Sequence, residues 1–151
     1  MDKKVEERAA QILKKARRNY KYDIPYLAGY SKDAKTLYVD RHVPTTFSYK
    51  SKHYNFHKFL LRHESVEKAA IIEHKLGYKA AHKIARRAEY DAVKAAGIPL
   101  KFYRKYCGRW IKRAGHEKLN RVPPDLDLLP YRAFKTKEDK ALLKQMKCLM
   151  K

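Results

Sequence analysis

The sequence predicts an α+β fold in which a small antiparallel β-sheet, made of hairpins, packs with four to five helices. Two observations carry this prediction. Apolar residues recur at helical spacing in 3–19 and in 56–114, whereas 24–54 consists of short runs rich in aromatic and β-branched residues. The chain has 151 residues, of which 44% are hydrophobic. That length and composition fit a single domain, spanning 1–151, with a modest core.

The first half of the chain reads as one helix followed by two hairpins. Residues 3–19 contain neither Gly nor Pro and repeat apolar residues with helical spacing. The runs 24–30 and 35–40 flank a plausible turn and predict a β-hairpin. A second, weaker hairpin is expected around Lys50 and Ser51.

The second half is predicted to be mainly helical. Asn55 is a suitable N-cap for a helix that continues to about residue 75, where Gly77 is expected to close it in the left-handed conformation. A second helix is expected from 78 to 96, ended by Gly97, and a third from Pro99 to 114. The region 120–150 is expected to combine an extended segment with a C-terminal helix, which Thr136 and Asp139 would cap.

The charge of the chain points to anionic partners. There are 37 Lys and Arg residues against 16 Asp and Glu residues, a formal net charge of +21. Such a surface attracts nucleic acid or an acidic protein through counterion release, and the alternative is a merely solvated surface. Aromatic residues alternate with cations in 101–113, which suits nucleic acid, although rings at helical spacing are more often core. The candidate nucleic-acid-binding residues are Lys101, Arg104, Lys105, Arg109, Lys112 and Arg113.

Two further features bear on location. No apolar run approaches the about 18 residues of a membrane span. Cys107 and Cys148 form no C-x-x-C pair, which favours reduced thiols and a cytoplasmic protein.

The most informative stretch is 62–68, because it has the layout of a metal-binding helix. His63 and Glu67 are four residues apart and would share one helical face, with Glu64 directly after His63. On the next predicted helix His82 and Glu89 also share a face, and an antiparallel pair would let all of these groups converge. His63 and Glu67 would then hold a divalent ion with either His82 or Glu89 as third ligand. Glu64 would be the catalytic base.

Zinc is the expected ion, and the carboxylate ligand keeps iron and manganese open. A purely structural interpretation is also open. Glu67 would then pair with Lys68, Arg86 or Arg87, or His63 would be a core histidine that is hydrogen-bonded to Glu67 or Glu89.

The runs 27–30 and 37–40, followed by Phe59-Leu60-Leu61-Arg62-His63-Glu64, resemble the zincin-like metallopeptidases. The likeness is greatest to the short intracellular kind related to phage-repressor-regulating proteases and covers about residues 24–93. It implies a helix, a hydrophobic hairpin and a His-Glu-x-x-His helix in that order, with a later acidic residue, here Glu89, completing the metal site. The chain departs from that pattern because Glu67 stands in the place of the second His.

The two readings give two expected functions. The first is a zincin-like, metal-dependent hydrolase that acts on a peptide bond. The alternative is a basic binding module of phage origin, without catalysis, that contacts nucleic acid or an acidic protein.

Overall fold

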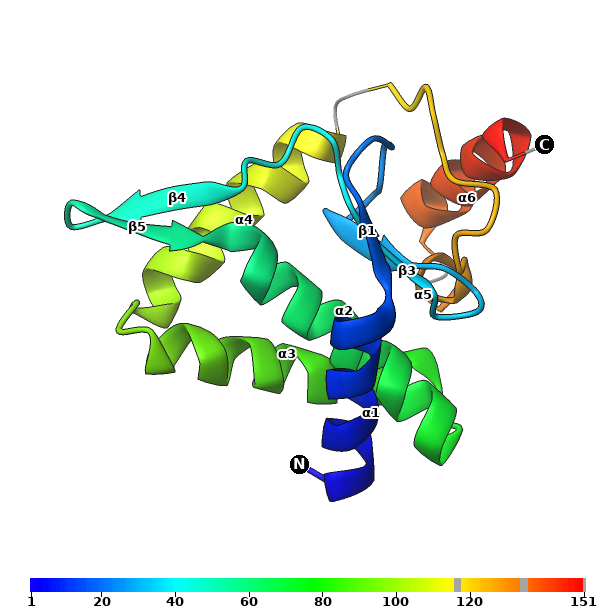
Figure 1. Cartoon of the computed structure of the whole chain (residues 1–151). Helices are drawn as coiled ribbons and strands as arrows, with labels where there is room; N and C mark the ends of the chain where they lie inside the picture. The colour runs from blue at the N-terminus through cyan, green and yellow to red at the C-terminus, as the bar shows by residue number, and fades with distance from the viewer. Residues whose placement is uncertain (116–117, 134–135, 151) are drawn as a thin grey trace.

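The computed structural model describes residues 1–115, 118–133 and 136–150, and within them the fold is α+β, as predicted. Figure 1 shows the long helix α2 running through the middle of the molecule, with the other elements around it. The helices are α1 (Lys3–Lys15), α2 (Phe56–His74), α3 (Tyr78–Ala95), α4 (Leu100–Gly115), α5 (Leu129–Arg132) and α6 (Lys137–Leu149). The strands are β1 (Arg17–Asn19), β2 (Ala28–Tyr30), β3 (Thr36–Val39), β4 (Thr46–Tyr49) and β5 (Lys52–Asn55).

Both expected hairpins are present. Strand β2 pairs antiparallel with β3, and β4 pairs antiparallel with β5. The second hairpin turns through Lys50 and Ser51, which have φ angles of 47° and 67°. Left-handed conformation at both central residues is the arrangement that matches the twist of a two-residue hairpin.

The first sheet differs from the prediction at its edge. The N-terminal helix was expected to reach residue 19, but it ends at Lys15, and β1 pairs parallel with β3 in a sheet of order β1-β3-β2. Ala16 is extended, with ψ of 142°, and the backbone N–H of Arg17 donates to the carbonyl of Lys35 at 2.9 Å. Pairing with a distant strand thus overrides the local helical pattern.

The ends of the central helices combine two confirmed caps and one correction. Asn55 caps α2 by accepting a hydrogen bond from the backbone N–H of Lys58. Gly97, with φ of 83°, lies just past α3 as expected. The helix α2, however, is ended by Lys75, which adopts the left-handed conformation at φ 50°. Gly77 is instead the N-cap of α3 in extended conformation.

The core has two parts. The larger part surrounds α2 and includes residues of α1, both hairpins, α3 and α4. The smaller part lies under the C-terminal region and includes Ile24, Tyr38, Leu126 and Met146. The segment before α6 was expected to be extended, but it contains the one-turn helix α5. Thr136 caps α6 as expected, through the backbone N–H of Asp139.

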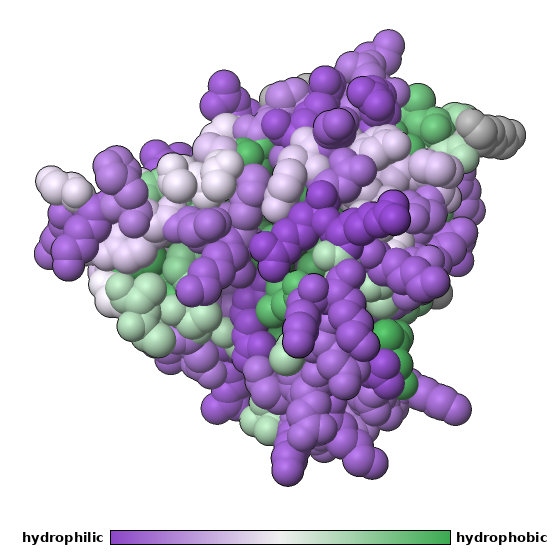
Figure 2. All heavy atoms as spheres, in the orientation of Figure 1, coloured by the Kyte–Doolittle hydropathy of each residue, from purple (hydrophilic) through white to green (hydrophobic). Residues whose placement is uncertain are grey.

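The outside of the molecule is mostly polar. Figure 2 shows hydrophilic residues over most of the visible face, with hydrophobic residues confined to small patches. Among the described residues, no helix is both long and apolar enough to cross a membrane.

Candidate metal centre

The helix α2 carries an unusual number of buried polar side chains. Most of its residues between Phe56 and Ala70 are buried, and only Lys58 and Arg62 in that stretch are not. His63 and Glu64 are each 8% exposed and Glu67 is 2% exposed. Burying such groups is costly unless they are paired or hold a metal. Their partners therefore reveal what the site can do.

The antiparallel helix α3 supplies those partners, as the sequence predicts. The Nδ1 atom of His82 lies 2.9 Å from Oε2 of Glu67 and 3.1 Å from Nε2 of His63. The same Nε2 atom lies 3.1 Å from Oε2 of Glu67. Two nitrogens and one oxygen, from three residues, thus form a nearly equilateral triangle.

The triangle matches the face of a tetrahedral metal site. A zinc ion with bonds of about 2.0–2.1 Å holds its ligand atoms about 3.3 Å apart. The measured separations of 2.9–3.1 Å are only a few tenths of an ångström shorter. The three atoms would have to move apart by that amount to hold the ion. The donor set of two imidazoles and one carboxylate also suits a catalytic ion, since it leaves a fourth position open.

A second layer of hydrogen bonds fixes the ligand atoms. The Nδ1 atom of His63 lies 2.8 Å from Oε1 of Glu89, and Oε2 of Glu89 accepts a hydrogen bond from the hydroxyl of Tyr103. The hydroxyl of Tyr30 donates to Oε1 of Glu67 at 2.8 Å. His63 and Glu67 therefore each contribute one side-chain atom to the triangle. The other nitrogen of His63 and the other oxygen of Glu67 are hydrogen-bonded to Glu89 and Tyr30. Glu89 lies on the opposite nitrogen of His63 from the triangle, so its position suits an orienting group rather than the third ligand.

Hydrogen bonds within this cluster shift the pKa values of His63 and Glu67 in opposite directions. Burial alone would lower the pKa of His63, but hydrogen bonds with Glu67 and Glu89 outweigh it and raise that pKa well above its usual value. Burial would raise the pKa of Glu67, but hydrogen bonds from His63 and His82 lower it to about 2. These contacts favour the protonated form of His63, whose ring lies between the carboxyl groups of Glu67 and Glu89.

Glu64 behaves differently from its neighbours. Burial, reinforced by the negative charge of Glu67, raises its pKa to about 8. No hydrogen bond joins its carboxyl group to any residue within the described ranges, and the side chain lines a cavity of about 400 Å³. A carboxyl group that titrates near neutrality and faces a cavity has the properties of a general base.

The cavity beside Glu64 is lined by both the metal candidates and other side chains. His63, His82 and Glu89 contribute to its wall, as do Tyr78 and Arg86. The hydroxyl of Tyr78 lies 3.1 Å from Nδ1 of His82, and Nη2 of Arg86 donates to Nε2 of the same ring at 3.1 Å. Because Nε2 accepts from Arg86, Nδ1 of His82 carries the ring proton, which is directed at Glu67.

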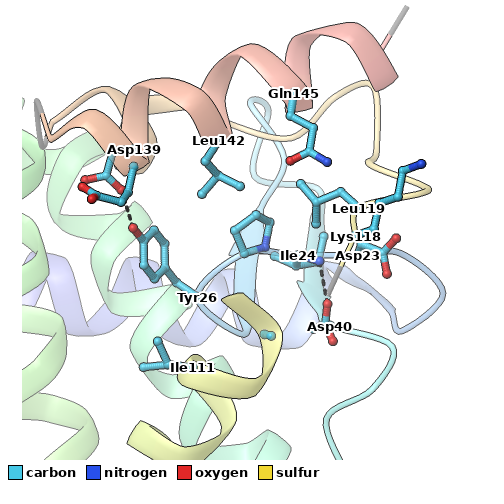
Figure 3. A pocket seen from close by; sticks show the side chains of 13 residues that line it. Asp23, Ile24, Tyr26, Asp40, Ile111, Lys118, Leu119, Asp139, Leu142 and Gln145 are labelled. Atoms are coloured by element: carbon cyan, nitrogen blue, oxygen red, sulfur yellow. Dashed lines mark hydrogen bonds between the residues drawn. The ribbon is translucent and has the colours of Figure 1, made fainter. Parts of the chain in front are cut away.

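A second cavity, of about 210 Å³, adjoins the first (Figure 3). Tyr26, Ile111 and Asp139 line both cavities. Figure 3 shows the Tyr26 ring pointing toward Asp139, to which its hydroxyl donates a hydrogen bond. Leu142 projects toward this second cavity from α6, and the side away from Tyr26 combines Leu119 with polar residues such as Lys118 and Gln145.

One other group of metal-type side chains exists among the described residues, made of Asp23, Asp40 and His42. Its carboxylate oxygens already accept backbone hydrogen bonds. Those of Asp23 accept from Asn120 and Arg121, and one of Asp40 accepts from Ile24. These bonds join loops and give the carboxylates a structural role.

The structure also shows which of the contacts expected under the structural alternative are formed. Glu67 does not pair with Lys68, whose ammonium lies 2.9 Å from Oδ2 of Asp127. Arg86 contacts His82 rather than Glu67. The hydrogen bonds of His63 with Glu67 and Glu89 are those of the structural alternative, and they leave the metal-site geometry intact.

The supporting tyrosines could not be identified from the sequence. Tyr26 and Tyr30 lie in the predicted hairpin, but nothing there distinguishes them from Tyr38, whose hydroxyl donates to Asp125. Tyr103 looks like one more apolar residue at helical spacing. Only the packing of α4 and β2 against α2 brings Tyr103 and Tyr30 to the site.

No protein-family model, curated protein or solved structure matches this chain. The argument for its function therefore rests on the geometry of these residues.

Proposed function

We propose that this chain is a zincin-like, metal-dependent hydrolase that acts on a peptide bond. The observation that carries the proposal is the triangle formed by Nε2 of His63, Oε2 of Glu67 and Nδ1 of His82, with sides of 2.9–3.1 Å. Zinc is the preferred ion, and iron and manganese are the alternatives that a carboxylate donor admits. The resemblance to zincin-like metallopeptidases adds support through the order of α1, the β2–β3 hairpin and the helix bearing His63-Glu64.

Each residue of the site has a role in this proposal. His63, Glu67 and His82 hold the ion, which when bound acts as a Lewis acid and lowers the pKa of a water molecule toward neutrality. Glu64 takes the proton of that water and delivers it to the leaving amine. Glu89 and Tyr30 keep His63 and Glu67 in position through their outer atoms.

In this proposal His82 takes the role that the second His has in the His-Glu-x-x-His pattern. Glu67 occupies the place of the second His, and a second imidazole comes instead from the following helix. With Nδ1 of His82 as ligand atom, the ring proton would stand on Nε2, to which Nη2 of Arg86 could then no longer donate.

The two adjoining cavities favour a polymeric substrate. Together they extend from the triangle past Tyr26 to a region of mixed polarity near Leu142. A polypeptide has the length to use both, with the bond to be cleaved beside Glu64 and a side chain in the second cavity.

Metal content is the first test. Protein purified without a His-tag should contain about one zinc, iron or manganese ion per chain by elemental analysis. The variant His63→Ala should lose the ion, whereas His53→Ala, an exposed histidine in the hairpin, should keep it. Substoichiometric metal in the wild-type protein, unchanged in His63→Ala and not restored by added zinc, would refute the proposal.

Turnover is the second test and uses a library of internally quenched peptides. Glu64→Gln should keep the ion and lose about 10²-fold or more of the cleavage rate, because it removes the base without removing a ligand. The exposed Glu7→Gln serves as the control and should cleave at the wild-type rate. If the metal-loaded protein cleaves no peptide of the library, the chain binds an ion but is not a peptidase.

A further inference from the structure

The proposed hydrolase makes no use of the strongly basic surface over α4. All six predicted nucleic-acid-binding residues, Lys101, Arg104, Lys105, Arg109, Lys112 and Arg113, are exposed. They occupy the side of the helix opposite Tyr103, which is fully buried. None of the six forms a salt bridge with a residue in the described part of the chain.

The β4–β5 hairpin extends this surface beyond α4. In Figure 1 the hairpin projects from the body of the molecule beside α4. The ring of Tyr49 in β4 lies 4.7 Å from the ring of Phe102 in α4, and Phe47 lies 4.9 Å from Tyr106. Lys50 and Lys52, both exposed, stand at the end of the hairpin, and the Lys50 ammonium lies 5.6 Å from the centre of the Tyr49 ring.

The absence of acidic residues makes this surface distinct from the rest of the chain. No Asp or Glu occurs in 41–63, which includes the hairpin, or in 92–116, which includes α4. These two stretches contain 12 Lys and Arg, whereas the rest of the chain contains 25 Lys and Arg together with all 16 Asp and Glu. They therefore contribute more than half of the net charge of +21.

The aromatic residues of the surface are buried or half-buried and contact one another or cations. The ring of Tyr49 lies beside that of Phe102, and the guanidinium groups of Arg109 and Arg113 lie over the rings of Tyr106 and Trp110 at 5.6 Å and 5.1 Å. These contacts compete with stacking on unpaired bases, which is how single strands are held. Contacts to phosphate remain, and they are densest along a duplex.

We propose that α4 and the β4–β5 hairpin form a binding surface for a nucleic-acid duplex, which they contact through backbone phosphates without reading the sequence. The 16 residues of α4 extend about 24 Å, the length of about seven phosphates along one strand. The two cavities lie on the other side of α4, with Cys107 and Ile111 in their walls, so this function does not depend on the metal centre.

The test measures binding of untagged protein to a fluorescent duplex of about 20 base pairs and random sequence. Six phosphate contacts give a slope of log K against log salt of about −5, so binding should weaken about 10³-fold between 50 and 200 mM salt. The triple variant Arg104→Gln, Lys105→Gln, Arg109→Gln should bind at least about tenfold more weakly at 50 mM salt. Its slope should be shallower by about three.

The matched control removes the same charge from another place. Lys4→Gln, Lys14→Gln, Lys15→Gln changes three exposed lysines of α1 and should leave the slope within about one unit of the wild-type value. A second pair, Lys50→Asn and Lys52→Gln, should make the slope shallower by about one to two and leaves α4 untouched. Asn is used at position 50 because it tolerates the positive φ angle.

Several results would overturn the proposal. Equal weakening by the α4 and α1 triple variants would mean that only net charge matters. Absence of binding at 50 mM salt, or tighter binding to a single strand of the same length, would exclude the duplex. Tighter binding to phosphatidylserine vesicles would assign the surface to a membrane. Because none of these measurements involves metal or peptide cleavage, their outcome is separate from that of the hydrolase.

Discussion

The Nδ1 atom of His63 lies 2.8 Å from Oε1 of Glu89, although the two residues are 26 positions apart and belong to different helices. This contact fixes the ring so that Nε2 points at Glu67 and His82. In that orientation Nε2 of the buried His63 is available as a ligand atom.

Replacement of Glu89 tests that relationship. In Glu89→Gln a neutral amide faces the imidazole, so the ring is less basic and less firmly oriented, and zinc affinity should fall about 10- to 100-fold. Asp91→Asn is the control, since Asp91 is exposed on the same helix and should leave affinity unchanged. Competition with a chelating dye provides the measurement. An unchanged affinity in Glu89→Gln would show that the contact does not orient the ligand.

Arg86 should oppose metal binding in the free protein. Its guanidinium donates to His82, and its charge repels a cation in the triangle. The variant Arg86→Met should therefore bind zinc roughly 5- to 10-fold more tightly, corresponding to about 1 kcal/mol of repulsion near a surface. Arg87→Met removes an equal charge from the neighbouring exposed position and should have little effect. Weaker zinc binding by Arg86→Met would instead give Arg86 a supporting role.

The raised pKa of Glu64 makes stability depend on pH in metal-free protein. Its pKa is about 8 in the folded state against an ordinary value of 4.5. Between these values the folded state keeps a proton that the unfolded state has lost, so the free energy of unfolding falls as pH rises. The expected slope is on the order of 1 kcal/mol per pH unit.

Urea denaturation of chelator-treated protein at several pH values between 5.5 and 7.5 measures this effect. Glu64→Gln should flatten the decline and be more stable than the wild-type protein at pH 7.5. His63 adds a decline of the same sign above its unfolded pKa, because its folded pKa is also raised, and this part should persist in Glu64→Gln. Parallel curves for the two proteins would show that Glu64 is ionised throughout.

Tyr30 ties the β-sheet to the site through its hydroxyl. In Tyr30→Phe the Oε1 atom of Glu67 loses its donor in a position that is 2% exposed, which should cost about 1–3 kcal/mol of stability. Tyr54→Phe is the control, because its half-buried hydroxyl makes no hydrogen bond within the described residues, and it should change stability by less than about 0.5 kcal/mol. Both are measured by urea denaturation, and equal effects would contradict the assignment.

Two glycines should respond in opposite directions to the same substitution. A Cβ atom at Gly29 would lie 3.0 Å from Cδ1 of the buried Leu126, so Gly29→Ala should destabilise the protein by about 1–3 kcal/mol. A Cβ atom at Gly108, inside α4, meets nothing within 4 Å. Gly108→Ala should stabilise by about 0.5–1 kcal/mol. Thermal or urea unfolding measures the stability of both variants. If Gly29→Ala is as stable as the wild-type protein, Leu126 and the C-terminal segment can move to accommodate the added Cβ atom.

The sequence by itself determined the class of fold, most helix ends and the set of candidate site residues, because these depend on local spacing and caps. Asn55, Gly97 and Thr136 cap or end helices as predicted, for reasons confined to a few neighbouring residues. The strand β1 and the left-handed conformation of Lys75 in place of Gly77 could not be predicted, since pairing with β3 and the short connection to α3 decide them.

Only the tertiary structure decided which atoms meet. Helical spacing places His63 and Glu67 on one face, but the register between α2 and α3 sets His82 in the triangle and Glu89 behind His63. The same holds for the basic surface, which needs the hairpin to pack against α4. Contacts between distant segments depend on how side chains of all of them fill one core, and no local pattern in the sequence encodes that.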